Sequence, residues 1–303
     1  MLTAELRAFL FAHPAAHSLS PALHRAALAA AGWRGSYRAE DVLPAQLPAR
    51  LLALRAQATS SEVSSGKFVT GANLSLPHKV TAIRLLDGLT PAAQAVGAVN
   101  TVFWEDGELR GDNTDAPGLR AALLDAGYQP DPGRRAALLG AGGAARAALW
   151  VLREWGVPTL ILNRTPERAR ALAAEWGHAG WAVQQREAQA VDWAEVGLIL
   201  NASSAGLERP HETPLDLSPA HWRQLPTGAL VYDMVYRPEH TRLRRDAAAQ
   251  GLLNEGGLGM LAHQAALAFA RWTGETVDAG VLLRAARREL AGAQMGASAE
   301  GPA

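Results

Sequence analysis

The chain has 303 residues, of which 49% are hydrophobic, and its 29 lysines and arginines balance 29 aspartates and glutamates. That length supplies apolar material for two ordinary domain cores, while the neutral charge excludes a net field that would favour nucleic acid or an anionic membrane. The absence of cysteine excludes disulfides and thiolate metal sites and fits a reducing compartment. We therefore expect a cytoplasmic protein that acts on small molecules. We also expect no metal centre, and either a monomer or a homodimer.

The first hundred residues alternate short apolar runs with helical patterns. The predicted strands and the helices after them span 8–11 and 21–31, 37–42 and 44–56, and 68–74 and 77–86. Pro21, Pro44 and Pro77 stand at the helix starts, where a missing N–H has no intrahelical partner. This βαβ order is typical of a mostly parallel sheet.

Two serines precede the first helix in the sequence His17-Ser18-Leu19-Ser20-Pro21. Two hydroxyls ahead of a helix N-terminus are well placed to bind a carboxylate, because the unpaired N–H groups and the helix dipole attract anions. The same residues also describe an ordinary N-cap followed by proline. Taken alone, the pattern favours the cap.

Lys79 ends the sequence Asn73-Leu74-Ser75-Leu76-Pro77-His78-Lys79 and is one of only two lysines, the other being Lys67, against 27 arginines. An amine can exchange a proton, whereas a guanidinium effectively cannot. Lys79 is therefore a candidate acid or base. The alternative is a loop lysine that faces water.

A strand is predicted over 98–104, followed by a turn at 105–107 and the polar sequence Gly111-Asp112-Asn113-Thr114-Asp115. Asn100 belongs to this strand, and Asp115 opens the next helix, where the dipole stabilises its charge. Each residue has an ordinary structural explanation when taken by itself. The polar sequence is the expected domain junction.

A second series of predicted strands covers 136–139, 159–162, 198–201 and 230–233. The first of them leads into Gly140-Ala141-Gly142-Gly143-Ala144-Ala145, a glycine-rich turn between strand and helix. Gly140 permits a tight turn, and Gly142 lets the backbone approach a pyrophosphate at the helix N-terminus. The strand and helix context favours a dinucleotide site over a purely structural turn.

The second strand of this series ends in Asn163-Arg164-Thr165, where an NAD site would carry an acidic residue. Arg164, and Arg168 one helical turn later, could instead bind a 2′-phosphate through charge-assisted hydrogen bonds. The sequence thus predicts NADP over NAD. The alternative is that both arginines are solvated residues at a helix start.

A helix is predicted from Gly257 onward, with an apolar face that includes Met260 and Phe269, and Thr273-Gly274 closes it. The last residues, 292–303, are mostly small and offer little to bury. They are predicted to form a disordered tail.

Taken together, these motifs resemble the shikimate dehydrogenase family over about residues 8–290. The motifs are His17-Ser18-Leu19-Ser20-Pro21, Asn73 to Lys79, Ala98-Val99-Asn100-Thr101, Gly111 to Asp115, Gly140 to Ala145, Asn163-Arg164-Thr165 and Gly257-Leu258-Gly259-Met260-Leu261. The resemblance implies an α/β protein of two domains. A substrate-binding domain would span 1–114, completed by returning C-terminal helices at 257–291, and a Rossmann-like, doubly wound NADP domain would span 115–256. The implied reaction is the reversible, NADPH-dependent reduction of 3-dehydroshikimate to shikimate in aromatic amino acid biosynthesis.

The resemblance also implies roles by motif position, with Lys79 and Asp115 as the catalytic pair. The residues implied to bind substrate are Ser18, Ser20, Ser75, Asn100, Tyr236 and Gln264. Those implied to bind the cofactor are Gly140, Gly142, Gly143, Ala144, Asn163, Arg164, Thr165, Arg168, Met234, Gly257 and Met260. The chain departs from the family pattern at Ser75, His78 and Gly256, where threonine, phenylalanine and aspartate are usual.

Carbonyl reduction places negative charge on an oxygen that must also receive a proton, and Lys79 as an ammonium can serve both needs. Asp115 would favour the ammonium form, because opposite charges stabilise each other. In the reverse direction the amine must accept a proton, which predicts faster oxidation at alkaline pH. Two alternatives stay open: a quinate/shikimate dehydrogenase of wider range, often NAD-dependent, and a regulatory relative that binds NADP without turnover.

Overall fold

The computed structural model describes residues 5–16, 18–59, 68–177, 181–207 and 209–299. The chain divides into two compact units: unit 1 comprises Met1–Gly118 and Leu261–Ala303, and unit 2 comprises Leu119–Met260. Both ends of the chain therefore build unit 1, and one continuous segment builds unit 2. The divisions fall inside helices α5 (Asp115–Asp125) and α10 (Leu258–Thr273), a few residues after the junctions predicted at 114/115 and 256/257.

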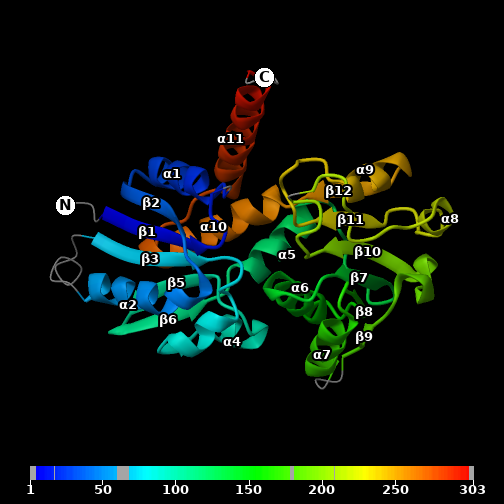
Figure 1. Cartoon of the computed structure of the whole chain (residues 1–303), viewed down its shortest axis with the longest axis horizontal. Coiled ribbons are helices and arrows are strands. Elements are labelled where there is room, and N and C mark those ends of the chain that lie inside the picture. Colours follow the sequence, from blue (N-terminus) through cyan, green and yellow to red (C-terminus); the bar gives the residue numbers. More distant parts are fainter. Residues whose placement is uncertain (1–4, 17, 60–67, 178–180, 208, 300–303) are drawn as a thin grey trace. The chain divides into compact units, whose positions relative to one another are not determined.

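Unit 1 contains a six-stranded sheet of order β2-β1-β3-β5-β6-β4 (Figure 1). Its strands are β1 (Glu5–Ala12), β2 (Arg34–Asp41), β3 (Phe68–Leu74), β4 (Gly88–Leu89), β5 (Thr101–Glu105) and β6 (Glu108–Asp112). β1 is parallel to β2 and β3, as the βαβ pattern predicts, but β5 is antiparallel to β3 and β6. Asp106 and Gly107 connect β5 to β6 with φ values of 52° and 83°, which a two-residue hairpin turn requires.

The helices of unit 1 differ from the sequence prediction in one place that matters for the site. They are α1 (Ser20–Ala31), α2 (Leu47–Ala58) after a 3₁₀ turn at Pro44–Gln46, α4 (Pro91–Val96), α10, α11 (Ala279–Ala299) and the start of α5. The helix predicted over 77–86 is wrong: residues 76–80 form a turn, and only Thr81–Leu85 are helical, as a 3₁₀ helix. Contacts between this turn and other segments outweigh its local helical pattern.

The disordered tail predicted over 292–303 is wrong for 292–299, because α11 continues to Ala299. Alanine, glutamine and methionine favour helix, and adding residues to an existing helix costs far less than starting one. Residues 300–303 lie outside the described residues. Within the described ranges, no helix has the combination of length and apolar character that crossing a membrane requires.

α10 is held onto the sheet of unit 1 by a tryptophan that needs a glycine beneath it. A Cβ added to Gly71 of β3 would lie 2.2 Å from the indole Nε1 of Trp272. That nitrogen donates a hydrogen bond to the Val102 carbonyl of β5 at 3.0 Å. Any side chain at Gly71 would therefore displace the helix that carries Gln264.

Unit 2 contains a six-stranded parallel sheet of order β12-β11-β10-β7-β8-β9. Its strands are β7 (Arg135–Leu139), β8 (Thr159–Leu162), β9 (Val183–Gln185), β10 (Val196–Asn201), β11 (Leu230–Asp233) and β12 (Leu253–Gly256). The connecting helices are α6 (Gly143–Glu154), α7 (Pro166–Gly177), α8 (Pro219–Trp222) and α9 (Arg242–Ala249), with 3₁₀ turns at Ala188–Ala190 and Trp193–Glu195. Counted within the unit, this is the doubly wound order 3-2-1-4-5-6, whose direction of winding reverses between β7 and β10.

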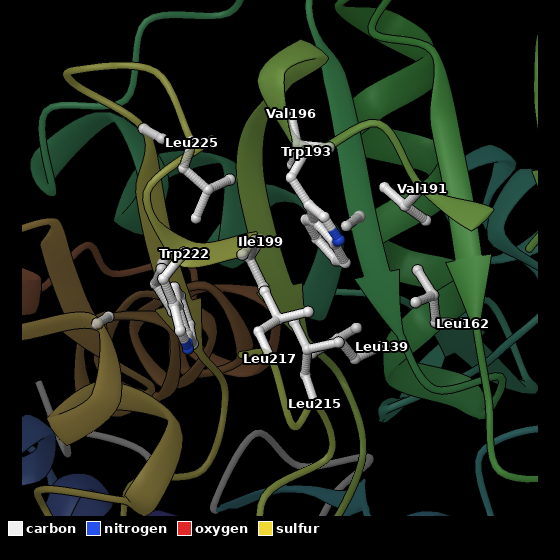
Figure 2. Packing of buried hydrophobic residues seen from close by; sticks show 14 of the residues in the cluster. Leu139, Leu162, Val191, Trp193, Val196, Ile199, Leu215, Leu217, Trp222 and Leu225 are labelled. Atoms are coloured by element: carbon white, nitrogen blue, oxygen red, sulfur yellow. The ribbon is translucent and has the colours of Figure 1, made fainter. Parts of the chain in front are cut away.

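One face of this second sheet is closed by large apolar side chains rather than by a long helix. Figure 2 shows Trp193 and Trp222 on either side of Ile199 of β10 in this view. Trp193 is fully buried, and truncating such a side chain in a protein core typically costs about 3–5 kcal/mol. This packing anchors the strands whose carboxyl ends carry the glycine-rich turn.

Candidate functional site

The turn after β3 holds Lys79 through contacts on both of its sides. The ring of His78 is buried, and its Nε2 lies 2.8 Å from the Val42 carbonyl. Burial lowers the pKa of His78, and the bond to Val42 opposes that shift. The carbonyl of Lys79 itself accepts a hydrogen bond from Val99 N at 2.8 Å. His78 thus ties the turn to the segment that follows β2.

Lys79 and Asp115 form a close ion pair in unit 1. Lys79 Nζ lies 2.7 Å from Asp115 Oδ2, and the two side chains are 15% and 2% exposed. Asp115 is in the first turn of α5, where the helix dipole stabilises its charge. Because an ammonium has three N–H donors, this pair leaves Lys79 able to donate to another oxygen.

Asn100 joins this pair to α10. Its Oδ1 accepts a hydrogen bond from Thr114 N at 2.7 Å, which turns Nδ2 toward Asp115 Oδ1 at 3.0 Å and Gln264 Oε1 at 2.8 Å. The side chain is almost fully buried. Lys79, Asn100, Asp115 and Gln264 therefore form one connected cluster. Their catalytic and substrate-binding roles stay predictions.

Ser18 and Ser20 pair with each other instead of capping α1. The helix begins at Ser20, its N-cap residue is Leu19, and no side chain caps it. Ser18 Oγ donates to Ser20 Oγ at 3.2 Å and accepts from Ser20 N at 3.2 Å. The structure thus disfavours the ordinary N-cap interpretation and leaves two hydroxyls together at a helix start. His17, in the same motif, lies outside the described residues.

The other two residues predicted to bind substrate are Ser75 and Tyr236. Ser75 is half-buried one residue beyond β3, and its N–H donates to the Phe11 carbonyl at 3.0 Å. Tyr236 is half-buried and belongs to unit 2. Both residues stay predictions as substrate ligands.

Sequence reasoning missed a buried polar layer beneath Asn100. Tyr37 OH donates to Asn73 Oδ1 at 2.8 Å, and Asn73 Nδ2 donates to the Asn100 carbonyl and to Thr101 Oγ1, both at 3.1 Å. Asn73 stands in the same motif as Lys79, which was the available signal. Tyr37 comes from β2, far away in sequence, and nothing near it indicates the contact.

The glycine-rich turn follows β7, at the point where the order of the second sheet reverses. Gly140 has a φ of 113°, and an added Cβ would lie 3.0 Å from Ser203 N. Gly142 is exposed, and an added Cβ would meet nothing within 4 Å. Gly142 is also the N-cap of α6 and offers no side-chain cap. The first N–H groups of α6 are consequently available to an anion, which is the arrangement that a pyrophosphate requires.

Arg164 and Arg168 are exposed at the start of α7. Among the described residues, neither guanidinium forms a hydrogen bond or an ion pair. The neighbouring Glu167 is paired with Arg170 at 2.5 Å, and Asn163 Nδ2 donates to the Thr165 carbonyl at 2.8 Å. The guanidinium groups of Arg164 and Arg168 are therefore suited to binding a 2′-phosphate. No carboxylate occupies the position after β8 that would select NAD.

The remaining predicted cofactor residues lie at the same carboxyl edge of the unit 2 sheet or in α6 beside it. Gly143 and Ala144 form the first turn of α6. A Cβ added to Gly257 would lie 2.0 Å from the Met234 carbonyl, so only glycine fits after β12. The N–H of Met260 donates a hydrogen bond to Tyr232 OH at 3.3 Å.

Fold and geometry together define a two-unit α/β protein with a dinucleotide-type edge and a lysine–aspartate pair. Residues 10–102 match the shikimate dehydrogenase substrate binding domain, and residues 257–287 match the shikimate 5′-dehydrogenase C-terminal domain. A shikimate dehydrogenase (NADP(+)) of Thermus thermophilus is 46% identical over 285 residues, which are 94% of this chain and 99% of that protein. The enzyme of the same name from Moorella thermoacetica is 41% identical over 97% of this chain and 95% of its own length.

The solved structures lead to the same family. Shikimate 5-dehydrogenase from Thermus thermophilus, in complex with NADP(H) and shikimate, matches with a TM-score of 0.80 and 43% identity over 93% of this chain and 99% of that chain. The chain therefore belongs to the shikimate dehydrogenase family. The predicted fold class, an α/β protein with a doubly wound second unit, is confirmed.

Proposed function

We propose that this protein catalyses the reversible, NADPH-dependent reduction of 3-dehydroshikimate to shikimate. The observation that carries the proposal is the ion pair of Lys79 and Asp115 at 2.7 Å, held beside Asn100 and Gln264 in unit 1. Family membership and the names of relatives that are at least 41% identical over most of the chain support it.

Lys79 is the residue that handles the proton. In the reductive direction its ammonium donates a proton to the carbonyl oxygen as negative charge develops there. Asp115 Oδ2 orients the ammonium, while Asn100 holds Asp115 Oδ1. The partial exposure of Lys79 then allows solvent to restore its proton.

The other groups bind and orient the substrate. Ser18 and Ser20 hold the carboxylate at the start of α1, where the helix dipole adds to their hydrogen bonds. Asn100 and Gln264 bind ring hydroxyls. Gln264 can donate through Nε2, whereas Asn100 would exchange its 2.8 Å bond to Gln264 Oε1 for one to the substrate. Ser75 and Tyr236 complete this set.

The residues of unit 2 fit NADP. The N-terminus of α6 holds the pyrophosphate, Gly142 leaves space for its approach, and Arg164 with Arg168 binds the 2′-phosphate. When bound, NADPH supplies the hydride for the carbonyl carbon. Asn163, Thr165, Met234 and Met260 add further contacts to the cofactor.

A spectrophotometric assay with shikimate and NADP tests the proposal. The assay is repeated with NAD in place of NADP and with quinate in place of shikimate. We expect NADP to be reduced with shikimate, little reduction of NAD, and a rate that rises at alkaline pH. Comparable rates with quinate or NAD would indicate the quinate/shikimate dehydrogenase alternative. Binding of NADP without any turnover would indicate a regulatory relative.

A further inference from the structure

Asp233, the last residue of β11, is a fully buried carboxyl group that the proposed chemistry does not use. Its Oδ1 accepts hydrogen bonds from Asn201 Nδ2 at 2.8 Å and Val235 N at 3.0 Å, and its Oδ2 accepts one from Thr241 Oγ1 at 2.6 Å. The donors belong to the end of β10, the segment after β11 and the start of α9. One carboxyl group therefore joins three segments at the carboxyl edge of the sheet.

The first branch leads to the glycine-rich turn. Because Asp233 Oδ1 accepts, Nδ2 of Asn201 faces it, and Oδ1 of Asn201 faces the opposite way. There it accepts from Ser203 N at 2.9 Å and from Ser203 Oγ at 2.7 Å. Ser203 N is the atom that a Cβ on Gly140 would approach to 3.0 Å. The orientation of the Asn201 side-chain amide thus fixes the position of Ser203, which lies against Gly140.

The second branch leads to the residues between β11 and β12. Asp233 fixes Val235 N, and the Val235 carbonyl accepts a hydrogen bond from Gly257 N at 3.4 Å. Met234, between Asp233 and Val235, has its carbonyl against Gly257, where no side chain fits. The carboxyl group therefore also fixes the backbone of Met234 and its contact with Gly257.

We propose that Asp233 is the positioning residue of the cofactor edge, which holds the segment beside Gly140 and the segment of Met234 in the geometry that NADP binds. The inference rests on the proposed function only in naming NADP as the ligand. A carboxylate suits this position because it has no hydrogen to donate. Asn201 Nδ2, Val235 N and Thr241 Oγ1 must therefore all direct their hydrogens toward it. Burying this carboxyl group would be unfavourable if the three donors were absent.

The main test compares Asp233→Ala with Asp233→Asn. The dissociation constant of NADP is measured by titration calorimetry without substrate, and the KM for NADP is measured alongside it. We expect Asp233→Ala to weaken NADP binding about tenfold, because Asn201 and Val235 lose their shared acceptor. Asparagine retains an Oδ1 acceptor for both donors, so Asp233→Asn should recover most of the affinity.

Asn201→Ala tests the first branch alone and serves if Asp233→Ala does not fold. It should weaken NADP binding several-fold, and the double variant should lose less than the product of the two single losses, because both changes break one chain of contacts. Hydrogen exchange supplies a readout that needs no cofactor. The amides of Ser203 and Val235 should exchange faster in Asp233→Ala than in the unmodified protein.

Thr159→Val is the matched control in the same sheet. Thr159 is as buried as Asp233, and its Oγ1 donates to the Val157 carbonyl at 3.1 Å at the opposite end of the strands. This change should lower Tm and leave the NADP dissociation constant unchanged. If Asp233→Ala behaves in the same way, with a lower Tm and unchanged NADP affinity, the residue is only structural and the inference is overturned. Failure of the unmodified protein to bind NADP at all would instead overturn the proposed function.

Discussion

In the proposed reaction, Lys79 has two roles that a substitution can separate. The ammonium stabilises a developing negative charge, and it also gives up a proton. Its contact with Asp115 Oδ2 at 2.7 Å keeps it oriented for both. An arginine could preserve the charge and an ion pair, but its guanidinium does not release a proton at any useful rate.

We therefore predict that Lys79→Arg loses nearly as much kcat as Lys79→Ala, on the order of 10²–10⁴ if proton transfer dominates. Binding of shikimate and NADP should persist in both variants, which equilibrium titration can confirm. Rescue of most of the rate by arginine would mean that charge stabilisation dominates. Unchanged turnover in Lys79→Ala would contradict the assignment of the active site.

His24 is a buried residue close to the same cluster. Among the described residues neither ring nitrogen has a hydrogen bond of good geometry, but an interaction with the Asn73 side chain partly opposes the effect of burial on the pKa. Its ring stacks on Tyr37 with centroids 4.0 Å apart and an interplanar angle of 11°. Burial lowers the pKa of His24 to about 3. In the unfolded chain the same imidazole titrates near 6.5, so the unfolded state takes up a proton first as the pH falls.

Acidification should therefore destabilise the protein through His24. The penalty is absent above pH 6.5 and grows by about 1.4 kcal/mol per pH unit toward pH 3, reaching about 2 kcal/mol at pH 5. We predict that His24→Phe, which keeps the stack, reduces the loss of Tm between pH 7 and pH 5. His211→Phe, at an exposed position, controls for losing a histidine, and equal pH dependence in both variants would refute the prediction.

At the scale of elements, we expect the end of β8 and the start of α7 to decide the choice between NADP and NAD. Arg164 and Arg168 have no partner among the described residues, whereas Arg170 on the same helix is paired with Glu167. The binding energy that Arg164 contributes should therefore go to the 2′-phosphate, which NAD lacks.

Arg164→Ala should raise the KM for NADP by about tenfold or more, since each factor of ten corresponds to about 1.4 kcal/mol. The KM for NAD should hardly change. Arg170→Ala removes a neighbouring guanidinium that already has an acidic partner, so it should affect neither cofactor. Equal losses with NADP and NAD in Arg164→Ala would show that the arginine supports α7 instead.

The elements that could be predicted are those whose signals are local. The strand, turn and helix around Gly140 follow from an apolar run, the glycines and a helical pattern within one short segment. The turn before Lys79 could not be predicted, because His78 is held by a carbonyl 36 residues away. β12 was missed for a different reason: its sequence, Leu253–Gly256, has no apolar run, as is common at a sheet edge.

At the scale of the whole molecule, the sequence order of the motifs hides the spatial grouping of the site. Asn100 and Gln264 are 164 residues apart and yet share a hydrogen bond of 2.8 Å in unit 1. Family resemblance, rather than residue pattern, assigned both residues to the ring hydroxyls, and neither predicted the hydrogen bond between them. Tyr37 and Asp233 illustrate the limit, since their roles arise from contacts between segments that carry no motif in common.

The two units should fold independently, because each has its own six-stranded sheet and its own buried core. Unit 1 consists of two separate stretches of sequence, but the end of the first lies close to the start of the second. A Cβ added to Gly118 would lie 2.9 Å from Gln264 N. A short glycine–serine linker can therefore replace residues 119–260 without spanning a long distance. The shortened chain retains Lys79, Asp115 and Gln264.

We predict that this shortened chain folds and binds shikimate but not NADP, and that a separate chain of residues 119–260 binds NADP but not shikimate. Both should lack turnover, because the reaction needs both ligands. Calorimetric titration of each chain with each ligand checks the four outcomes, and a cooperative melting transition in each checks folding. Loss of cooperative melting in either chain would show that its sheet depends on the other unit. If the shortened chain folds but does not bind shikimate, residues of unit 2 such as Tyr236 are essential for substrate binding.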